Sequence, residues 1–201
     1  MKPEIKSILA NLISLIIVFL VISIFLILIG SSPFEVYLAF LDGAFGNTDR
    51  FTRTLLTTAI LSISAFALVV TFTGGLWNIG IEGQLVAGSI GATVIARSFI
   101  GETVAAPVFE ILLGSLFGSL IAVFCGILKV RTKVHEIFGG LGLDFVAAGV
   151  IVYLVIGPWK REGIASTSGT DIFPDTAWIQ GFGEYGLPIW PIIFALIIGA
   201  S

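Results

Sequence analysis

The sequence predicts an all-α protein, a polytopic bundle of about six transmembrane helices with a broken or re-entrant segment near residues 74–83. Three observations predict this class: 57% of the side chains are apolar, only 11% are charged, and the mean hydropathy is +1.10. Water-soluble domains carry charge on about a quarter of their residues. We therefore expect the bilayer to be the solvent of this chain, and residues 1–201 to form a single membrane-embedded domain.

Charge and motifs exclude several function classes. Ten Lys and Arg stand against thirteen Asp and Glu, so a strongly basic nucleic-acid-binding protein is excluded. No Walker-type GxxxxGK[ST], HExxH or GxSxG string occurs, so we expect neither an ATPase nor another enzyme within these residues. The single cysteine, Cys125, cannot form an internal disulfide, and its apolar neighbours predict a small buried side chain.

The first half of the chain predicts two long spans and one short helix. Residues 8–29 are apolar and would form a helix of about 33 Å, which is long enough to cross a membrane. The second uncharged stretch, 54–81, is interrupted by Gly74 and Gly75. The third segment, 84–96, is short for a full span. We therefore expect irregular backbone between the second and third runs.

Small residues predict which helices lie inside the bundle. The fourth run, 111–128, carries four of them at a strict spacing of four, which lines one helix face. The third segment carries two such rows, so other helices can approach it on two sides. The rows are Gly114, Gly118, Ala122 and Gly126; Gly83, Ala87 and Gly91; and Gly88, Ala92 and Ala96.

The last two runs complete the predicted bundle. The fifth, 137–159, contains one acid, Asp144, and the sixth is apolar from Tyr185 to the end. An apolar run that continues to the last residue predicts a longer protein of which this is the N-terminal part. The basic residues of 129–133 predict a cytoplasmic turn. An acid inside a span has two interpretations. Asp144 either pairs with a Lys side chain or a backbone group, or it takes part in a proton relay.

The break carries the residues that predict function. Backbone that leaves the helix inside a membrane lines a cavity or is paired by protein groups, and transporters place substrate sites at such breaks. An indole and two amides suit a neutral polar ring such as a nucleobase or sugar. Glu82 is either part of the path or a structural acid that accepts backbone N–H bonds. The predicted path residues are Trp77, Asn78, Glu82 and Gln84.

The string LWNIGIEGQ at 76–84 is similar to the FNIGxEGQ segment of permease subunits of bacterial ABC importers for nucleosides and simple sugars. That broad family also includes ribose and branched-chain amino acid permeases. Three further strings follow the order of its N-terminal part: GAFGN at 43–47, AGSIGA at 87–92 and KVRTKVHEI at 129–137. The chain departs from the family at His135 and Asp144, where Asn is usual, and at Gly139-Gly140, which replace a Thr-containing turn.

The resemblance implies a multi-pass permease of the bacterial cytoplasmic membrane that holds no cofactor or metal. Two cytoplasmic ATPase subunits would supply ATP hydrolysis, a second permease chain would complete the path, and an extracytoplasmic lipoprotein would deliver the solute. The turn before the fifth run would couple to the ATPase, although positive-inside anchoring explains its basic residues equally well. The implied coupling residues are Lys129, Arg131, Lys133, His135 and Glu136.

Two alternatives remain open from the sequence. A secondary transporter would use Glu82 and Asp144 for proton coupling, and its uptake would collapse with the proton gradient rather than with ATP depletion. A purely structural membrane subunit would be unaffected by Glu82→Gln. If the break forms the path, Glu82→Ala or Trp77→Ala abolishes uptake without preventing membrane insertion.

Overall fold

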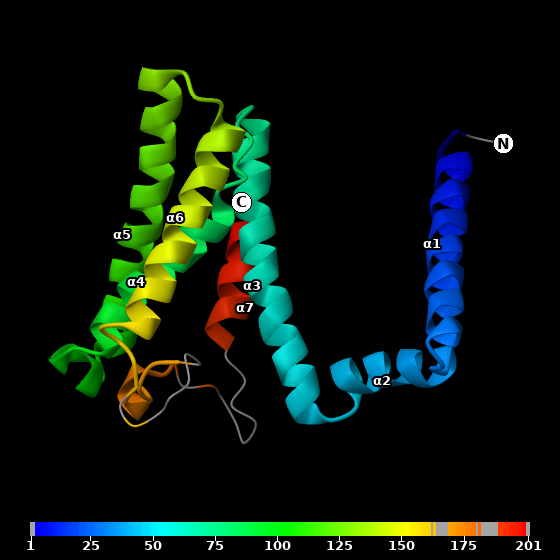
Figure 1. The fold of residues 1–201 in the computed structure, drawn as a ribbon, viewed down its shortest axis with the longest axis horizontal. Helices are drawn as coiled ribbons and strands as arrows, with labels where there is room; N and C mark the ends of the chain where they lie inside the picture. Colours follow the sequence, from blue (N-terminus) through cyan, green and yellow to red (C-terminus); the bar gives the residue numbers. More distant parts are fainter. Residues whose placement is uncertain (1–2, 162, 164–168, 180, 182–188, 200–201) are drawn as a thin grey trace. The chain divides into compact units, whose positions relative to one another are not determined.

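A computed structural model describes residues 3–161, 163, 169–179, 181 and 189–199, and all its regular elements are helices (Figure 1). The predicted all-α class is therefore confirmed. The chain forms two compact units, Met1–Thr57 and Thr58–Ser201. The elements are α1 (Pro3–Leu28), α2 (Pro33–Phe45), α3 (Thr48–Thr73), α4 (Ile81–Ala96), η1 (Phe99–Glu102), α5 (Ala106–Ile127), η2 (Leu128–Thr132), α6 (Glu136–Ile156), η3 (Asp175–Ala177) and α7 (Ile189–Gly199).

Four helical stretches among the described residues are long and apolar enough to cross a membrane: Ile8–Leu28, Thr48–Thr73, Ala106–Thr132 and Glu136–Ile156. The two remaining predicted runs correspond to α4 and α7, which have 16 and 11 helical residues. At 1.5 Å per residue α4 is about 24 Å long, shorter than the hydrocarbon core. The multi-pass architecture and the short third helix are thus as predicted.

The first unit also contains α2, a helix that lies between the predicted apolar runs. Ser32 caps α2, its side chain accepting from the N–H of Glu35, and a proline occupies the first turn. Tyr37 attaches α2 to α1, because its hydroxyl donates to the Phe19 carbonyl at 3.0 Å and lies 2.9 Å from the Ser23 hydroxyl. A Ser-Pro-x-Glu string is a helix-start signal that would have predicted α2.

In the second unit α4 packs against both α5 and α6 (Figure 1). A Cβ atom added to Gly114 would lie 3.0 Å from the Gly88 carbonyl oxygen, and one added to Gly118 would lie 3.0 Å from the Gln84 carbonyl oxygen. The small residues therefore permit close backbone approach, as predicted. The predicted row of Gly83 and Gly91 divides between partners, since Gly83 meets Asp144 of α6 and Gly91 meets Leu113 of α5.

The two ends of the second unit differ in structure. At one end, the π-helical turn η2 and Lys133, with a φ of 57°, connect α5 to α6. At the other end, η3 is tied to η1 by a hydrogen bond from the Thr176 hydroxyl to the Gly101 carbonyl, at 2.6 Å. Figure 1 shows α5 running from the end that carries η1 to the turn before α6. The basic turn predicted from the sequence thus lies at one end of the bundle.

Candidate functional site

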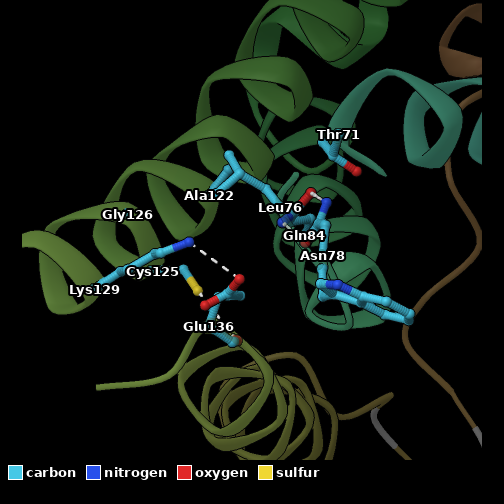
Figure 2. Close-up of a pocket in the computed structure, with 10 residues that line it drawn as sticks. Thr71, Leu76, Asn78, Gln84, Ala122, Cys125, Gly126, Lys129 and Glu136 are labelled. Atoms are coloured by element: carbon cyan, nitrogen blue, oxygen red, sulfur yellow. Dashed lines mark hydrogen bonds and ion pairs between the residues drawn. The ribbon is translucent and has the colours of Figure 1, made fainter. Parts of the chain in front are cut away.

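A cleft of about 190 Å³ opens where the chain leaves helix between α3 and α4 (Figure 2). We call it the break cleft. It brings together residues of α3, the break, α4, α5, η2 and the start of α6. Its lining residues are Thr71, Leu76, Trp77, Asn78, Gln84, Ala122, Cys125, Gly126, Lys129 and Glu136.

Glycine ends α3 and starts the break. The N–H of Leu76 donates to the Thr71 carbonyl at 2.9 Å, and that of Gly75 donates to the Phe72 carbonyl at 3.0 Å. Gly75 has a φ of +74°, which glycine adopts without steric cost. This is the Schellman arrangement of a helix C-terminus. It turns the chain away from the α3 axis, so that residues 76–80 are presented to the cleft before α4 begins.

Two amides of the break segment pair with each other. The Gln84 side-chain nitrogen donates to Asn78 Oδ1 at 3.0 Å, and the Asn78 nitrogen approaches Gln84 Oε1 at 3.4 Å. Each amide still has one free N–H and one free lone-pair direction, because a primary amide offers two donors and two acceptor sites. The pair can therefore recognise a polar solute without first breaking its own bonds.

The indole of Trp77 supplies an aromatic surface beside these amides. Its ring centroid lies 5.5 Å from that of Phe72, and 57% of the residue is exposed. One face is thus supported by α3 while much of the ring remains accessible. An accessible indole next to two amides can stack against a flat or weakly polar ring while the amides bind its edge. Three of the four predicted path residues therefore meet in one cleft.

The charged wall of the cleft comes from the turn between α5 and α6. Lys129 Nζ lies 3.0 Å from Glu136 Oε1, and the Glu136 side chain is only 15% exposed. Figure 2 shows this ion pair on one side of the break cleft and the amides of Asn78 and Gln84 on the other. Cys125 is half-buried beside it, with Sγ 3.9 Å from the Glu136 carbonyl oxygen, so it lines the cleft rather than lying in a closed core.

The other predicted coupling residues do not line the cleft. His135 caps α6, since its Nδ1 accepts from the N–H of Ile137 at 3.4 Å. Arg131 and Lys133 are exposed on the turn. Within the described part of the chain, no group of three or more His, Cys, Asp or Glu residues could hold a metal ion. The turn therefore has an inner part, Lys129 and Glu136, and an outer part that a soluble partner could contact.

Glu82 and Asp144, the two acids named in the sequence analysis, lie outside the break cleft. Glu82 is exposed in the first turn of α4. Asp144 Oδ1 accepts a hydrogen bond from the Gly83 N–H at 2.7 Å. Gly80, which precedes α4, gives it no side-chain cap, so Asp144 provides one from another helix. The backbone thus supplies one of the two partners that the sequence suggested for Asp144.

Sequence reasoning missed several lining residues. Thr71 and Leu76 flank the glycines of the break but were not predicted as path residues, and Cys125 was predicted to be buried. Ala122 and Gly126 were predicted to pack against a helix, but nothing lies within 4 Å of a Cβ atom added to Gly126. The row of small residues therefore changes role along α5. Its first half packs against α4, and its second half forms the wall of the cleft.

Comparison with known proteins identifies the family. The family described as the permease component of branched-chain amino acid transport systems matches residues 50–199. The chain belongs to this permease family. The matched range contains the break and every residue predicted for the path or for coupling. The family consists of transporter subunits rather than enzymes, and its membership agrees with the resemblance drawn from the break string.

Curated relatives of this permease chain carry transport names. It is 26% identical over 155 residues to the guanosine ABC transporter permease protein NupP of Bacillus subtilis, covering 77% of this chain and 44% of the relative. It is 28% identical over 164 residues to the nucleoside ABC transporter permease protein NupB of Lactococcus lactis, covering 81% of this chain and 45% of the relative. It is 31% identical over 126 residues to the glucose ABC transporter permease protein TsgB13 of Haloferax volcanii, covering 63% of this chain and 31% of the relative.

The chain spans less than half the length of these relatives. No solved structure matches it. Family membership, together with four stretches among the described residues that are long and apolar enough to cross a membrane, makes this a multi-pass membrane protein of the ABC permease type.

Proposed function

We propose that this chain forms part of the translocation path of an ATP-driven importer for a nucleoside, in the bacterial cytoplasmic membrane. The observation that carries the proposal is the break cleft, where Trp77, Asn78 and Gln84 converge at a helix break within a permease. Breaks of this kind let backbone and side chains meet a solute inside the membrane. The names of two relatives, which specify guanosine and nucleosides, support the same solute class.

The chemistry of the cleft favours a nucleobase over a sugar alone. A base has a flat face, which an accessible indole can stack against, and an edge of alternating donors and acceptors, which amides match. A simple sugar is the competing solute, and one relative is named for glucose. Sugar rings also stack on indoles, but they present hydroxyl groups around the whole ring. Uptake of the two solutes by one preparation separates these possibilities.

Partner subunits would supply what this chain lacks. Two cytoplasmic ATPase subunits would bind and hydrolyse ATP, a second permease chain would complete the path, and an extracytoplasmic lipoprotein would deliver the solute. Arg131, Lys133 and His135 on the exposed side of the α5–α6 turn would contact the ATPase. The Lys129–Glu136 ion pair would then carry motion of this turn to the cleft, because it belongs to both.

The proton-coupled alternative receives less support. The Asp144 carboxylate is occupied by the Gly83 N–H, and Glu82 lies outside the lining of the break cleft. A carboxylate engaged as a helix cap is poorly placed to exchange protons with a passing solute. Glu82, which the sequence predicts as a path residue, lies next to the break but does not line the break cleft. Its place in the path stays a prediction.

The test is uptake by the full-length permease in proteoliposomes with its ATPase, binding protein and second permease. We expect ATP-dependent uptake of guanosine in preference to glucose, and loss of that uptake in Trp77→Ala. Trp178→Ala, which removes a similarly exposed indole outside the cleft lining, is the control. Uptake driven by a proton gradient without ATP would overturn the importer, and preferential uptake of glucose would overturn the nucleoside.

A further inference from the structure

A second cleft of about 560 Å³ lies between α3, α4 and α5. We call it the serine cleft, after the four serines in its lining. Three helices contribute polar groups to a region that a membrane bundle would otherwise fill with apolar side chains. The polar residues used below are Ser64, Ser89, Ser115, Ser119, Gln84 and Glu110.

Glu110 is the acid of this cleft, and the sequence analysis overlooked it by starting the fourth run at residue 111. The structure starts α5 earlier, at Ala106, which places Glu110 within the candidate span Ala106–Thr132. Its Oε1 is buried and has no hydrogen-bond partner among the described residues. A carboxylate oxygen withdrawn from water needs a donor, because an unpaired buried polar group costs free energy. An incoming solute can supply that donor.

The serines add acceptors to the same cleft. The hydroxyl of Ser64 donates to the Ile60 carbonyl at 3.2 Å, that of Ser89 to Val86 at 2.7 Å, and that of Ser119 to Leu116 at 2.8 Å. The hydroxyl protons of these three serines are therefore used within their own helices, and their oxygens can still accept hydrogen bonds. Together with Glu110, these oxygens make a wall that accepts hydrogen bonds. It suits a solute face that donates them.

The serine cleft continues from the break cleft. Gln84 lines both clefts, so they meet at this residue. Along α5 and η2, the lining residues of the serine cleft fall between 110 and 119 and those of the break cleft between 122 and 129. The 19 steps from Glu110 to Lys129 cover about 28 Å at 1.5 Å per residue. The two clefts together thus follow nearly the whole hydrocarbon thickness of about 30 Å.

We propose that the serine cleft is a second solute subsite of the translocation path, beyond Gln84, with Glu110 as its anchor. The subsite takes the hydroxyl- or amine-bearing face of a solute, because its walls accept hydrogen bonds. It rests on the proposed transport function and extends the path toward the end of the bundle that carries η1. The competing occupants are another helix of the full-length protein and lipid, and the test below distinguishes both from a solute.

Thiol accessibility tests the subsite without measuring transport. Ser89→Cys and Ser119→Cys place a thiol in the serine cleft, and Ser62→Cys is the matched control. Ser62 lies two residues from Ser64 and also bonds back to its own helix, at Thr58, but it does not line the cleft. The measured quantity is the reaction rate with water-soluble methanethiosulfonates of either charge in the reconstituted full-length transporter. The rate of the unsubstituted transporter, which carries Cys125, is subtracted.

We expect both cleft cysteines to react faster than Ser62→Cys, and the cationic reagent to react faster than the anionic one. Glu110→Gln should abolish that charge preference, since it removes the anion and keeps the side-chain volume. Cleft cysteines that react no faster than Ser62→Cys would overturn the proposal, because a helix or lipid would then fill the groove.

Uptake provides the second measurement. We expect Glu110→Gln to lower guanosine uptake about tenfold, which corresponds to weakening one hydrogen bond to a charged group. Glu102→Gln, an exposed acid of η1 outside the cleft lining, is the control and should transport normally. Wild-type uptake by Glu110→Gln would overturn the subsite. If the wild-type transporter takes up neither guanosine nor glucose, the proposed function is overturned instead. The thiol reaction rates would still decide whether the serine cleft is open to water.

Discussion

Oδ1 of Asp144 on α6 accepts the backbone N–H of Gly83 in the first turn of α4, at 2.7 Å. This bond joins residues 61 positions apart and fixes the start of α4 after the break. The first N–H groups of a helix have no partner within the helix, and an anion beside them also interacts favourably with the helix dipole. Asp144 therefore determines where the polar break segment ends.

The first prediction concerns this cap. Asp144→Ala leaves the Gly83 N–H without its partner and should lower the free energy of unfolding by about 1–2 kcal/mol. Asp144→Asn keeps an acceptor oxygen and should lose less. The measurement is thermal unfolding of the purified full-length protein in detergent, with the exposed acid Asp175 replaced by Ala as control. Equal melting temperatures for Asp144→Ala and wild type would show that the bond adds no stability.

The second prediction concerns the contact beside that cap. A Cβ atom added to Gly140 of α6 would lie 2.7 Å from the backbone nitrogen of Gly80, and backbone cannot move aside cheaply. Gly140→Ala should therefore separate α4 from α6 and destabilise the protein by about 1–3 kcal/mol. Gly142→Ala is the matched control, because nothing lies within 4 Å of its added Cβ and alanine favours helix.

Melting temperature and guanosine uptake would both be measured for the two alanine variants. We expect Gly140→Ala to be lower than wild type in both measurements and Gly142→Ala to match or exceed wild type in stability. If the two variants melt alike, the Gly80–Gly140 approach does not limit the packing of α4 on α6.

The third prediction concerns the paired amides of the break cleft. Asn78→Ala and Gln84→Ala should each reduce uptake, and the double variant should lose little more than either single one. When two side chains act as a unit, replacing either one removes most of their joint contribution, so the losses from the two single variants do not add. Thr73→Val, which removes a hydroxyl bonded within α3 and outside the cleft lining, is the control. Additive losses would mean that the two amides act separately.

The apolar runs predicted the helices well because burial in lipid demands long, uninterrupted apolar segments. The position of the break also followed from local sequence, since Gly74 and Gly75 end α3 through a motif that depends on neighbouring residues. The same local logic would have predicted α2 from Ser32 and Pro33, and an earlier start of α5 from Pro107. Both helix starts are therefore encoded by start signals in the local sequence.

Contacts between residues that are far apart in the sequence could not be predicted from local sequence signals. Asp144 and Gly83, and Lys129 and the break, are brought together by how helices pack, which a single sequence does not specify. Four residues near the break were predicted as one set, yet Glu82 is outside the cleft that the other three line. In the first turn of α4, residues two apart point in different directions, so Glu82 and Gln84 cannot share a face.

The fourth prediction concerns the ion pair between Lys129 and Glu136, which joins η2 to the start of α6. If this pair carries motion from the α5–α6 turn to the cleft, Lys129→Met should raise the ATP hydrolysed per guanosine transported several-fold. Lys129→Arg keeps the cation and should retain most of the coupling. Lys133→Met removes the same charge from an exposed position of the same turn, which belongs to the proposed ATPase contact but not to the ion pair, and is the matched comparison. If Lys133→Met uncouples hydrolysis as strongly as Lys129→Met, the net charge of the turn matters rather than the ion pair. Attraction to a partner's surface depends on total charge, whereas a contact between two helices depends on the position of the charge.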